Sequence, residues 1–108
     1  MPSNPTQPFW SREPLDYYMS LLAAQQGSLA VTQADTRVLE RDADRGWMWL
    51  GAAYADRVHD LVDRGALVPD NHLTVRPHED TDDVQARLLS LTAVGRQVMT
   101  DMASHIPQ

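Results

Sequence analysis

Apolar side chains recur every three or four residues from Pro14 onward, which predicts an amphipathic helix over residues 14–26. Proline suits the first position of a helix, and Asp16 in the first turn interacts favourably with the positive end of the helix dipole. Gly27 is expected to end the helix, because glycine readily adopts the left-handed conformation found at many helix C-termini. The expected inward face consists of Leu15, Met19, Leu22 and, to a lesser degree, Tyr18.

The next stretch has the features of a second and a third helix. Thr32, followed three residues later by Asp35, is typical of a helix N-cap and predicts a second helix over about residues 33–44. A third helix is predicted over residues 47–64, with Gly65 just beyond its end. The residues expected to face the core are Val38 and Leu39 in the second helix and Leu50, Tyr54, Val58, Leu61 and Val62 in the third.

The remaining pattern is that of a hairpin followed by a helix. Apolar and polar residues alternate over residues 72–76 and again over the more apolar residues 85–91, and the polar residues 77–84 between them predict a turn. Thr92 is expected to cap a last helix over about residues 93–104. The inward face of this last helix is expected to consist of Val94, Val98, Met99 and Met102.

These elements predict one domain and one short arm. Residues 1–13 contain several prolines and no periodic pattern, so they are expected to form an extended N-terminal arm whose Phe9 and Trp10 dock on the domain or on a partner. Residues 14–106 are expected to form a single domain of the α+β class that is mainly helical. Its predicted architecture is a winged helix-turn-helix, with three helices, a two-stranded wing and a C-terminal helix.

Two short segments carry a resemblance to a known family. Residues 61–68 follow the pattern Leu-x-x-x-Gly-x-Leu-Val, and residues 89–96 contain Leu-Thr-x-x-Gly. Together, in this order, they resemble the two ends of the wing in MarR-like bacterial regulators, and the resemblance covers about residues 30–103. An unrelated small α+β domain with a glycine-terminated helix and a threonine-capped one remains the alternative.

The resemblance implies a transcriptional regulator that binds double-stranded DNA, with the third helix in the major groove and the wing beside it. Arginines supply most phosphate contacts in such proteins. The chain has nine basic residues, all of them arginine. The candidate DNA-contacting residues are Arg37, Arg41, Arg45, Arg57, Arg76 and Arg87.

The charge of the chain argues against DNA. Fifteen acidic residues outnumber the basic ones, which gives a formal net charge of −6. The wing tip is acidic from Glu79 to Asp83, and a phosphate backbone repels such a segment. The alternative function is therefore protein–protein interaction, in which an acidic surface binds a basic partner or mimics the charge of DNA. The candidate residues for that alternative are Trp49, Asp56, Asp60 and Asp63.

Other kinds of chemistry find little support in the sequence. The chain has no cysteine, so disulfides, thiolate zinc sites and thiol catalysis are excluded. No hydrolase, transferase or phosphate-binding motif is present, and we expect neither an enzyme nor a cofactor. The histidines and carboxylates of residues 72–83 lack regular ligand spacing, so a solvated acidic loop is preferred over a metal site. Without a long apolar run or a signal-peptide pattern, a cytoplasmic location is expected.

A homodimer is also expected, because one winged helix reads only a short half-site. Only the arm, the first helix and the last helix lie outside the predicted DNA-contacting elements. The apolar residues proposed for the dimer contact are Leu21, Leu22, Met99, Met102 and Ile106.

Overall fold

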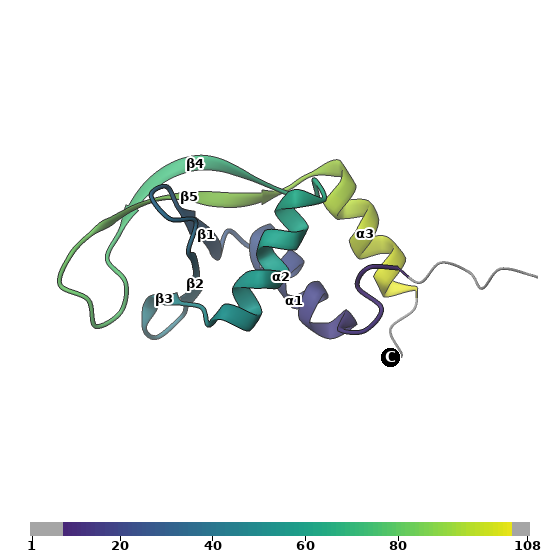
Figure 1. Ribbon diagram of the computed structural model, residues 1–108, viewed down its shortest axis with the longest axis horizontal. Helices are drawn as coiled ribbons and strands as arrows, with labels where there is room; N and C mark the ends of the chain where they lie inside the picture. The colour runs from purple at the N-terminus through teal and green to yellow at the C-terminus, as the bar shows by residue number, and fades with distance from the viewer. Residues whose placement is uncertain (1–7, 105–108) are drawn as a thin grey trace, which may run out of the picture.

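Five antiparallel strands form one sheet, and three helices pack against it (Figure 1). The computed structural model describes residues 8–104 of the chain. The sheet order is β3-β2-β1-β5-β4. Its strands are β1 (Leu29–Thr32), β2 (Val38–Asp42), β3 (Gly46–Trp49), β4 (Leu67–Val75) and β5 (Val84–Leu91). The helices are α1 (Pro14–Gln25), α2 (Ala52–Asp63) and α3 (Ala93–Ala103).

This architecture corrects the predicted fold class. A mainly helical winged helix-turn-helix was expected, but the chain has a five-stranded sheet where a two-stranded wing was predicted. The predicted second helix, residues 33–44, is a turn followed by β2. The predicted third helix begins later than expected, at Ala52, because residues 46–49 form β3.

The β1–β2 turn explains the first of these errors. The Thr32 hydroxyl donates a hydrogen bond to the Asp35 carboxylate and accepts one from the Arg37 amide, at 2.5 and 2.9 Å. These are the side-chain properties that suit an N-cap, but here they close a turn between two strands. Thr36 adopts a left-handed conformation, with φ of 54°, which a helix does not accommodate.

The β2–β3 hairpin explains the second error. The Asp42 carboxylate accepts hydrogen bonds from the amides of Asp44 and Arg45, at 2.8 and 3.0 Å. Gly46 follows with φ of 77°, a conformation that a side chain would strain. The chain therefore reverses, and Trp49 lies opposite Leu39 in the antiparallel pair.

Other predicted elements are confirmed. The first helix begins at Pro14, and the residues predicted as a wing form the β4–β5 hairpin. The Thr92 hydroxyl caps α3 by accepting a hydrogen bond from the Gly95 amide at 3.0 Å. Gly95 also has a packing role, because a Cβ atom there would lie 2.2 Å from the Ala66 carbonyl oxygen.

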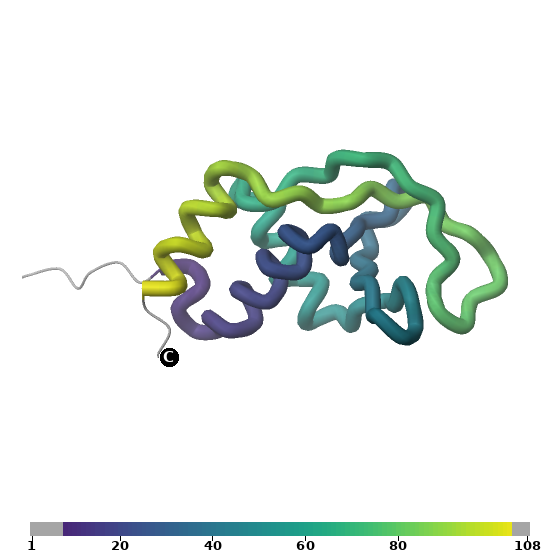
Figure 2. The backbone as a smooth tube through the Cα atoms, turned by 180° about the vertical axis from the view of Figure 1, so that it is seen from behind, coloured from purple at the N-terminus to yellow at the C-terminus, as the bar shows by residue number. Residues whose placement is uncertain are grey.

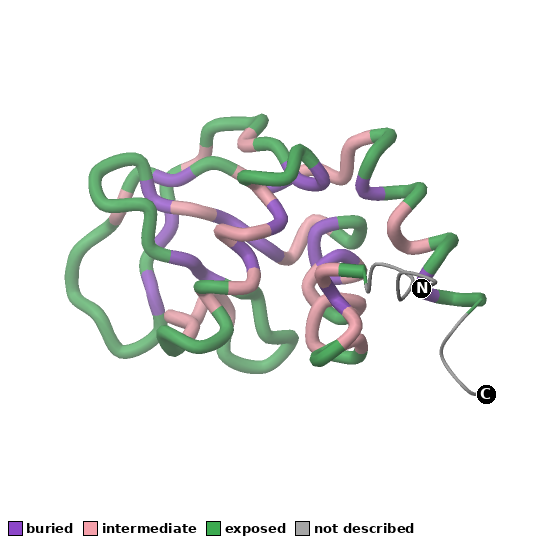
Figure 3. The backbone as a smooth tube through the Cα atoms, turned by 45° about the vertical axis from the view of Figure 1, so that its right-hand side comes forward, coloured by how far each residue is buried: buried purple, intermediate pink, exposed green. Residues whose placement is uncertain are grey.

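Two apolar clusters occupy the two faces of the sheet. Successive side chains of a strand point to opposite faces, so Leu29 and Ala30 belong to different clusters. The buried segments concentrate where strands and helices meet, whereas the connecting loops are largely exposed (Figure 3). The helix-covered cluster includes Leu21, Leu29, Val38, Leu61, Leu67, Leu89 and Met102. The opposite cluster consists of Ala30, Leu39, Val75 and Ala86, with Trp47, Trp49, Leu73, Val84 and Leu88 packed around it.

The β4–β5 loop (residues 76–83) bends back toward β3 and covers the second cluster. The His78 amide donates a hydrogen bond to the Trp47 carbonyl oxygen at 2.7 Å. Seen from behind, the tip of the β4–β5 hairpin comes down beside the β2–β3 turn (Figure 2). The two ends of the sheet are thus linked through this loop, although β3 and β4 are not neighbours in the strand order.

The N-terminal arm docks on its own chain in the part that the structure describes. Trp10 is 7% exposed and belongs to the helix-covered cluster. The Phe9 ring meets the Tyr17 ring edge-on, with centroids 5.2 Å apart, and the Arg64 guanidinium lies 4.1 Å from the Phe9 centroid. Of the two expectations for this aromatic pair, docking on the domain is confirmed.

Several predicted inward faces are wrong. In α1 the buried residues are Leu21, Ala23 and Ala24, whereas Leu15 and Met19 are 63% and 54% exposed. Tyr54 in α2 is 55% exposed, although it was expected to face the core. The arm and the helix α3 also pack against α1, so its contacts are not confined to the one stripe that the spacing marks.

Candidate functional site

The β1–β2 turn and the β4–β5 loop lie at the end of the sheet away from α3 (Figure 1), and an open groove lies between them. It separates the β1–β2 turn (residues 33–37) from the β4–β5 loop, and its volume is about 720 Å³. The turn contributes one wall and the loop the other, and Trp49 of β3 lies between them. The polar side chains that line it include Gln33, Asp35, Arg37, Asp80, Thr81, Asp82 and Gln85.

Trp49 is held in the groove by contacts from both walls. Its indole Nε1 donates a hydrogen bond to the Asp80 carboxylate at 2.9 Å. The Arg37 guanidinium lies 3.7 Å from the Trp49 ring centroid, a distance typical of a cation–π contact. These two interactions fix the plane of the ring and place an aromatic surface between two polar walls.

Carboxylates outnumber cations in the groove. Asp35 lies on one wall and Asp80 and Asp82 on the other, while Arg37 is the basic residue among the residues that line it. The hydrogen bond from Thr32 lowers the pKa of the Asp35 carboxyl, and Arg37 contributes to the same shift. The groove is therefore negatively charged at neutral pH.

Both walls contain a residue in a strained backbone conformation. Thr36 and Glu79 have φ of 54° and 67°, and within residues 8–104 they are the non-glycine residues with positive φ. A β-branched residue rarely adopts this conformation, and such strain is often found at binding sites. The ring of His59 on α2 contacts the Thr36 carbonyl oxygen at 2.6 Å, and this contact links the turn to α2.

The predicted DNA-contacting arginines are dispersed. Arg37 lies in the groove, and Arg41 and Arg45 are exposed on β2 and the turn that follows it. Arg76 forms an ion pair with Asp83 at 3.0 Å, whereas Arg87 is exposed on β5. These residues come from different elements, and none of them lies on α2.

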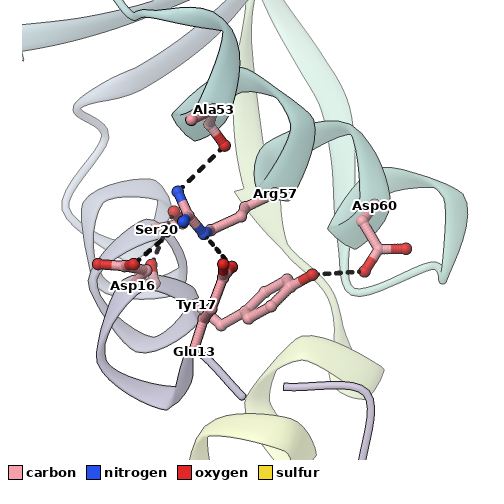
Figure 4. A network of polar contacts seen from close by, with 7 residues as sticks. All are labelled: Glu13, Asp16, Tyr17, Ser20, Ala53, Arg57 and Asp60. Atoms are coloured by element: carbon pink, nitrogen blue, oxygen red, sulfur yellow. Dashed lines mark hydrogen bonds and ion pairs between the residues drawn. The ribbon is translucent and has the colours of Figure 1, made fainter. Parts of the chain in front are cut away.

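Arg57, the candidate on α2, is paired with carboxylates at the start of α1. Its guanidinium forms a hydrogen-bonded ion pair with Glu13 and a second ion pair with Asp16 at 3.2 Å (Figure 4). It also donates to the Ala53 carbonyl oxygen at 3.0 Å, and its side chain is 15% exposed. The hydrogen bond from Arg57 lowers the pKa of the Glu13 carboxyl. The positive charge is thus neutralised within the domain.

The four candidates for protein binding do not form one surface. Trp49 lies on β3 rather than on a helix, because the third helix begins at Ala52. Asp60 accepts a hydrogen bond from the Tyr17 hydroxyl at 2.9 Å (Figure 4). It accepts another from Arg64 at 3.0 Å. Burial, followed by the contact with Asp60, raises the pKa of Tyr17. Only Asp56 and Asp63 of the row are exposed side chains on α2.

Sequence reasoning missed the groove because it assigned both walls to other structures. Asp35 was interpreted as part of a helix start, and Asp80 and Asp82 as a solvated loop tip. The signal that could have placed Trp49 on a strand is the pair of tryptophans directly after the turn residues Asp44 to Gly46, because aromatic residues bounded by a turn favour a strand. Within residues 8–104, no group of three histidine or acidic side chains is placed to hold a metal ion.

The comparisons with known proteins add no further assignment. None of the helices described for residues 8–104 combines the length and apolar character that crossing a membrane requires. No family model, curated protein or solved structure matches the chain.

Proposed function

We propose that the protein is a binding module that takes a basic segment of a partner protein into the Trp49 groove. The observation that carries this proposal is the position of Trp49 between aspartates on two opposite walls. The function belongs to the protein-interaction class considered from the sequence, but its site is the groove rather than the outer face of α2. The cytoplasmic location expected from the sequence is part of the same proposal.

The chemistry of the groove favours a cationic side chain as ligand. A lysine or arginine of the partner meets Asp35 on one wall and Asp80 or Asp82 on the other, and charge-assisted hydrogen bonds are among the stronger ones. The incoming side chain replaces the Arg37 guanidinium on the face of the Trp49 ring, where its apolar part packs, and tryptophan is enriched among residues that dominate binding energies. The net charge of −6 also speeds the approach of a basic partner.

The same electrostatics disfavour duplex DNA at this site, because phosphates are repelled by the carboxylates on both walls. Arg57, the one of the six candidate DNA-contacting arginines that lies on α2, is paired with Glu13 and Asp16. DNA binding by Arg37, Arg41 and Arg45 stays a prediction, and duplex DNA belongs in the same binding experiment.

A panel of synthetic arginine- and lysine-containing peptides, with neutral and acidic peptides for comparison, tests the proposal by fluorescence anisotropy. We expect basic peptides alone to bind, with an affinity that falls as salt rises. Asp35→Asn combined with Asp80→Asn should weaken binding by about tenfold or more. Asparagine at position 80 keeps an oxygen that can accept the indole hydrogen bond, so Trp49 stays in place.

The matched control carries Asp56→Asn and Asp63→Asn, which remove the same charge from exposed positions of α2. We expect this variant to bind the peptides within about twofold of the unaltered protein. Equal loss in both double variants, or no binding of any basic peptide, would overturn the proposal. Binding of duplex DNA in place of peptides would favour the transcriptional regulator.

A further inference from the structure

The Trp49 ring already carries a guanidinium when the groove holds no partner. The guanidinium carbon of Arg37 lies 3.7 Å from the ring centroid, closer than Arg64 lies to the Phe9 centroid, at 4.1 Å. A separation of 3.7 Å is ordinary van der Waals contact between a flat group and the face of a ring. The groove therefore contains, from its own wall, an example of a cation that fits on Trp49.

Arg37 is held on the ring only weakly. Its side chain is exposed, and its guanidinium forms no ion pair or hydrogen bond with any residue in the part of the chain that the structure describes. The Asp35 carboxylate on the same wall accepts its hydrogen bond from the Thr32 hydroxyl instead. An exposed cation–π contact contributes little free energy, so the Arg37 side chain can leave the ring without disturbing the rest of the fold.

The carboxylates on the opposite wall can bind a cation that comes from outside. Asp82 lines the groove, and within residues 8–104 it has no ion pair or side-chain hydrogen bond. Asp80 uses one carboxylate oxygen to accept from the Trp49 indole and has the other oxygen left to accept from a ligand. An incoming guanidinium thus combines the ring contact with charge-assisted hydrogen bonds that Arg37 does not make.

We propose that the groove selects arginine over lysine and that the partner's arginine takes the place on Trp49 that Arg37 occupies in the free protein. The inference rests on the proposed function and names the side chain that this function recognises. A guanidinium is flat and weakly hydrated, and its N–H donors lie in one plane, so it stacks on a ring and donates to carboxylates at the same time. The lysine ammonium is a compact and strongly hydrated charge, so it gains less from the ring.

Arg37 acts in this account as an internal competitor. A partner binds only those molecules in which Arg37 has left the ring, and the apparent affinity is lowered by that fraction. The strength typical of an exposed cation–π contact corresponds to an affinity lowered about two- to fivefold. Arg37 therefore tunes the affinity of the groove, whereas Trp49, Asp80 and Asp82 make the contacts with the partner.

The groove is complete within one chain, so arginine selectivity does not require the homodimer expected from the sequence. That homodimer stays a prediction. Of the apolar residues proposed for its contact, Leu21 and Met102 are fully buried within the chain, and Ile106 lies outside the described residues.

Two peptides of equal charge test the selectivity by isothermal titration calorimetry. One contains arginine at each basic position and the other contains lysine, so the long-range attraction to the acidic protein is the same for both. We expect the arginine peptide to bind at least about fivefold more tightly, because its guanidinium both stacks on Trp49 and donates to Asp80 and Asp82.

Variants at position 37 test the competition, with circular dichroism to confirm that each is folded. Arg37→Gln removes the competitor and should tighten the binding of both peptides by about two- to fivefold. Arg37→Lys keeps the charge but stacks less well, so it should give a smaller gain, which loss of charge alone would not produce. Arg45→Gln removes the same charge from the β2–β3 turn, outside the groove lining, and is the control. It should change the affinity by less than about 1.5-fold.

The side-chain protons of Arg37 report the displacement directly, because the ring current of Trp49 shifts protons that lie over the ring. We expect the δ-methylene protons of Arg37 to resonate upfield in the free protein and to return to ordinary values when the arginine peptide saturates the groove. Equal affinity for the two peptides, weaker binding by Arg37→Gln, or Arg37 protons that stay upfield at saturation would overturn this inference while binding of basic peptides stands. If neither peptide binds the unaltered protein or Arg37→Gln, the proposed function is overturned as well.

Discussion

The guanidinium of Arg37 lies 3.7 Å from the centroid of the Trp49 ring, so residues from the β1–β2 turn and from β3 meet across the floor of the groove. The two are twelve positions apart in the chain, and the β2–β3 hairpin brings them together. The contact orients the only tryptophan that the groove contains among the described residues. It also attaches the turn to the sheet.

Removal of Arg37 should therefore loosen the turn by a measurable amount. We predict that Arg37→Ala lowers the free energy of unfolding by about 0.5–1 kcal/mol, the value typical of an exposed cation–π contact. Chemical denaturation measures the change. Arg87→Ala, at an exposed position on β5 without a ring contact, is the control and should change stability by less than about 0.5 kcal/mol.

The strained turn residue gives a prediction of the opposite sign. Thr36 has φ of 54°, and a left-handed conformation costs a residue with a side chain roughly 1–2 kcal/mol, which glycine does not pay. We predict that Thr36→Gly stabilises the protein by about 1 kcal/mol after the entropy of glycine is counted. Thr74→Gly in β4 is the control. Thr74 does not have a positive φ, so glycine relieves no backbone strain there and should lower the free energy of unfolding by about 0.5–1 kcal/mol. A loss of stability with Thr36→Gly would show that the turn is unstrained.

The close approach at Gly95 gives the largest expected loss. A Cβ atom there would lie 2.2 Å from the Ala66 carbonyl oxygen, so α3 must shift away from the end of α2. We predict that Gly95→Ala costs about 2–3 kcal/mol in thermal or chemical unfolding. Gly51→Ala, where no atom lies within 4 Å of the new Cβ, should change stability by less than about 1 kcal/mol.

The pair of Glu13 and Arg57 makes stability depend on pH. The hydrogen bond from Arg57 lowers the pKa of Glu13 in the folded protein from its ordinary 4.5. The unfolded chain therefore binds a proton more readily, and the contribution of the pair is present above pH 4.5 and lost as the pH falls through the lowered pKa. We predict that Glu13→Gln destabilises the protein at pH 7 and that the difference from the unaltered protein shrinks as the pH falls below 4.5. Asp63→Asn, at an exposed residue of α2, is the control variant and should not show this trend.

Local sequence signals predicted the fold correctly where a residue and its neighbours favour a single local structure. Pro14 starts α1, Gly65 follows the end of α2, and Thr92 caps α3, as expected. Thr32 and Asp35 have two uses, because the hydroxyl and carboxylate that cap a helix also close a turn. Choosing between them depends on whether the following residues pair with another strand, and Val38 pairs with Val31 only in the folded chain.

The groove was predicted only in part, because its two walls come from segments that are distant in the sequence. Trp49 was selected from the sequence as a residue for protein binding, and it does line the groove. Its companions Asp35 and Asp80 come from loops that are 45 residues apart, so no local spacing indicates that they face each other. The long hairpin that carries Asp80 bends back on β3 through the contact of His78 with Trp47, which depends on packing beneath the loop.

The most direct test of the groove is a heteronuclear NMR titration of the protein with a short arginine- and lysine-rich peptide. The Trp49 indole N–H donates to Asp80, so its resonance reports on the floor of the groove. We predict that this resonance shifts together with the backbone amides of residues 33–37 and 80–85 and that the shifts decrease in high salt. Shifts confined to α2 or to the arginines of the β2–β3 hairpin, with Trp49 unaffected, would contradict the groove as the binding site.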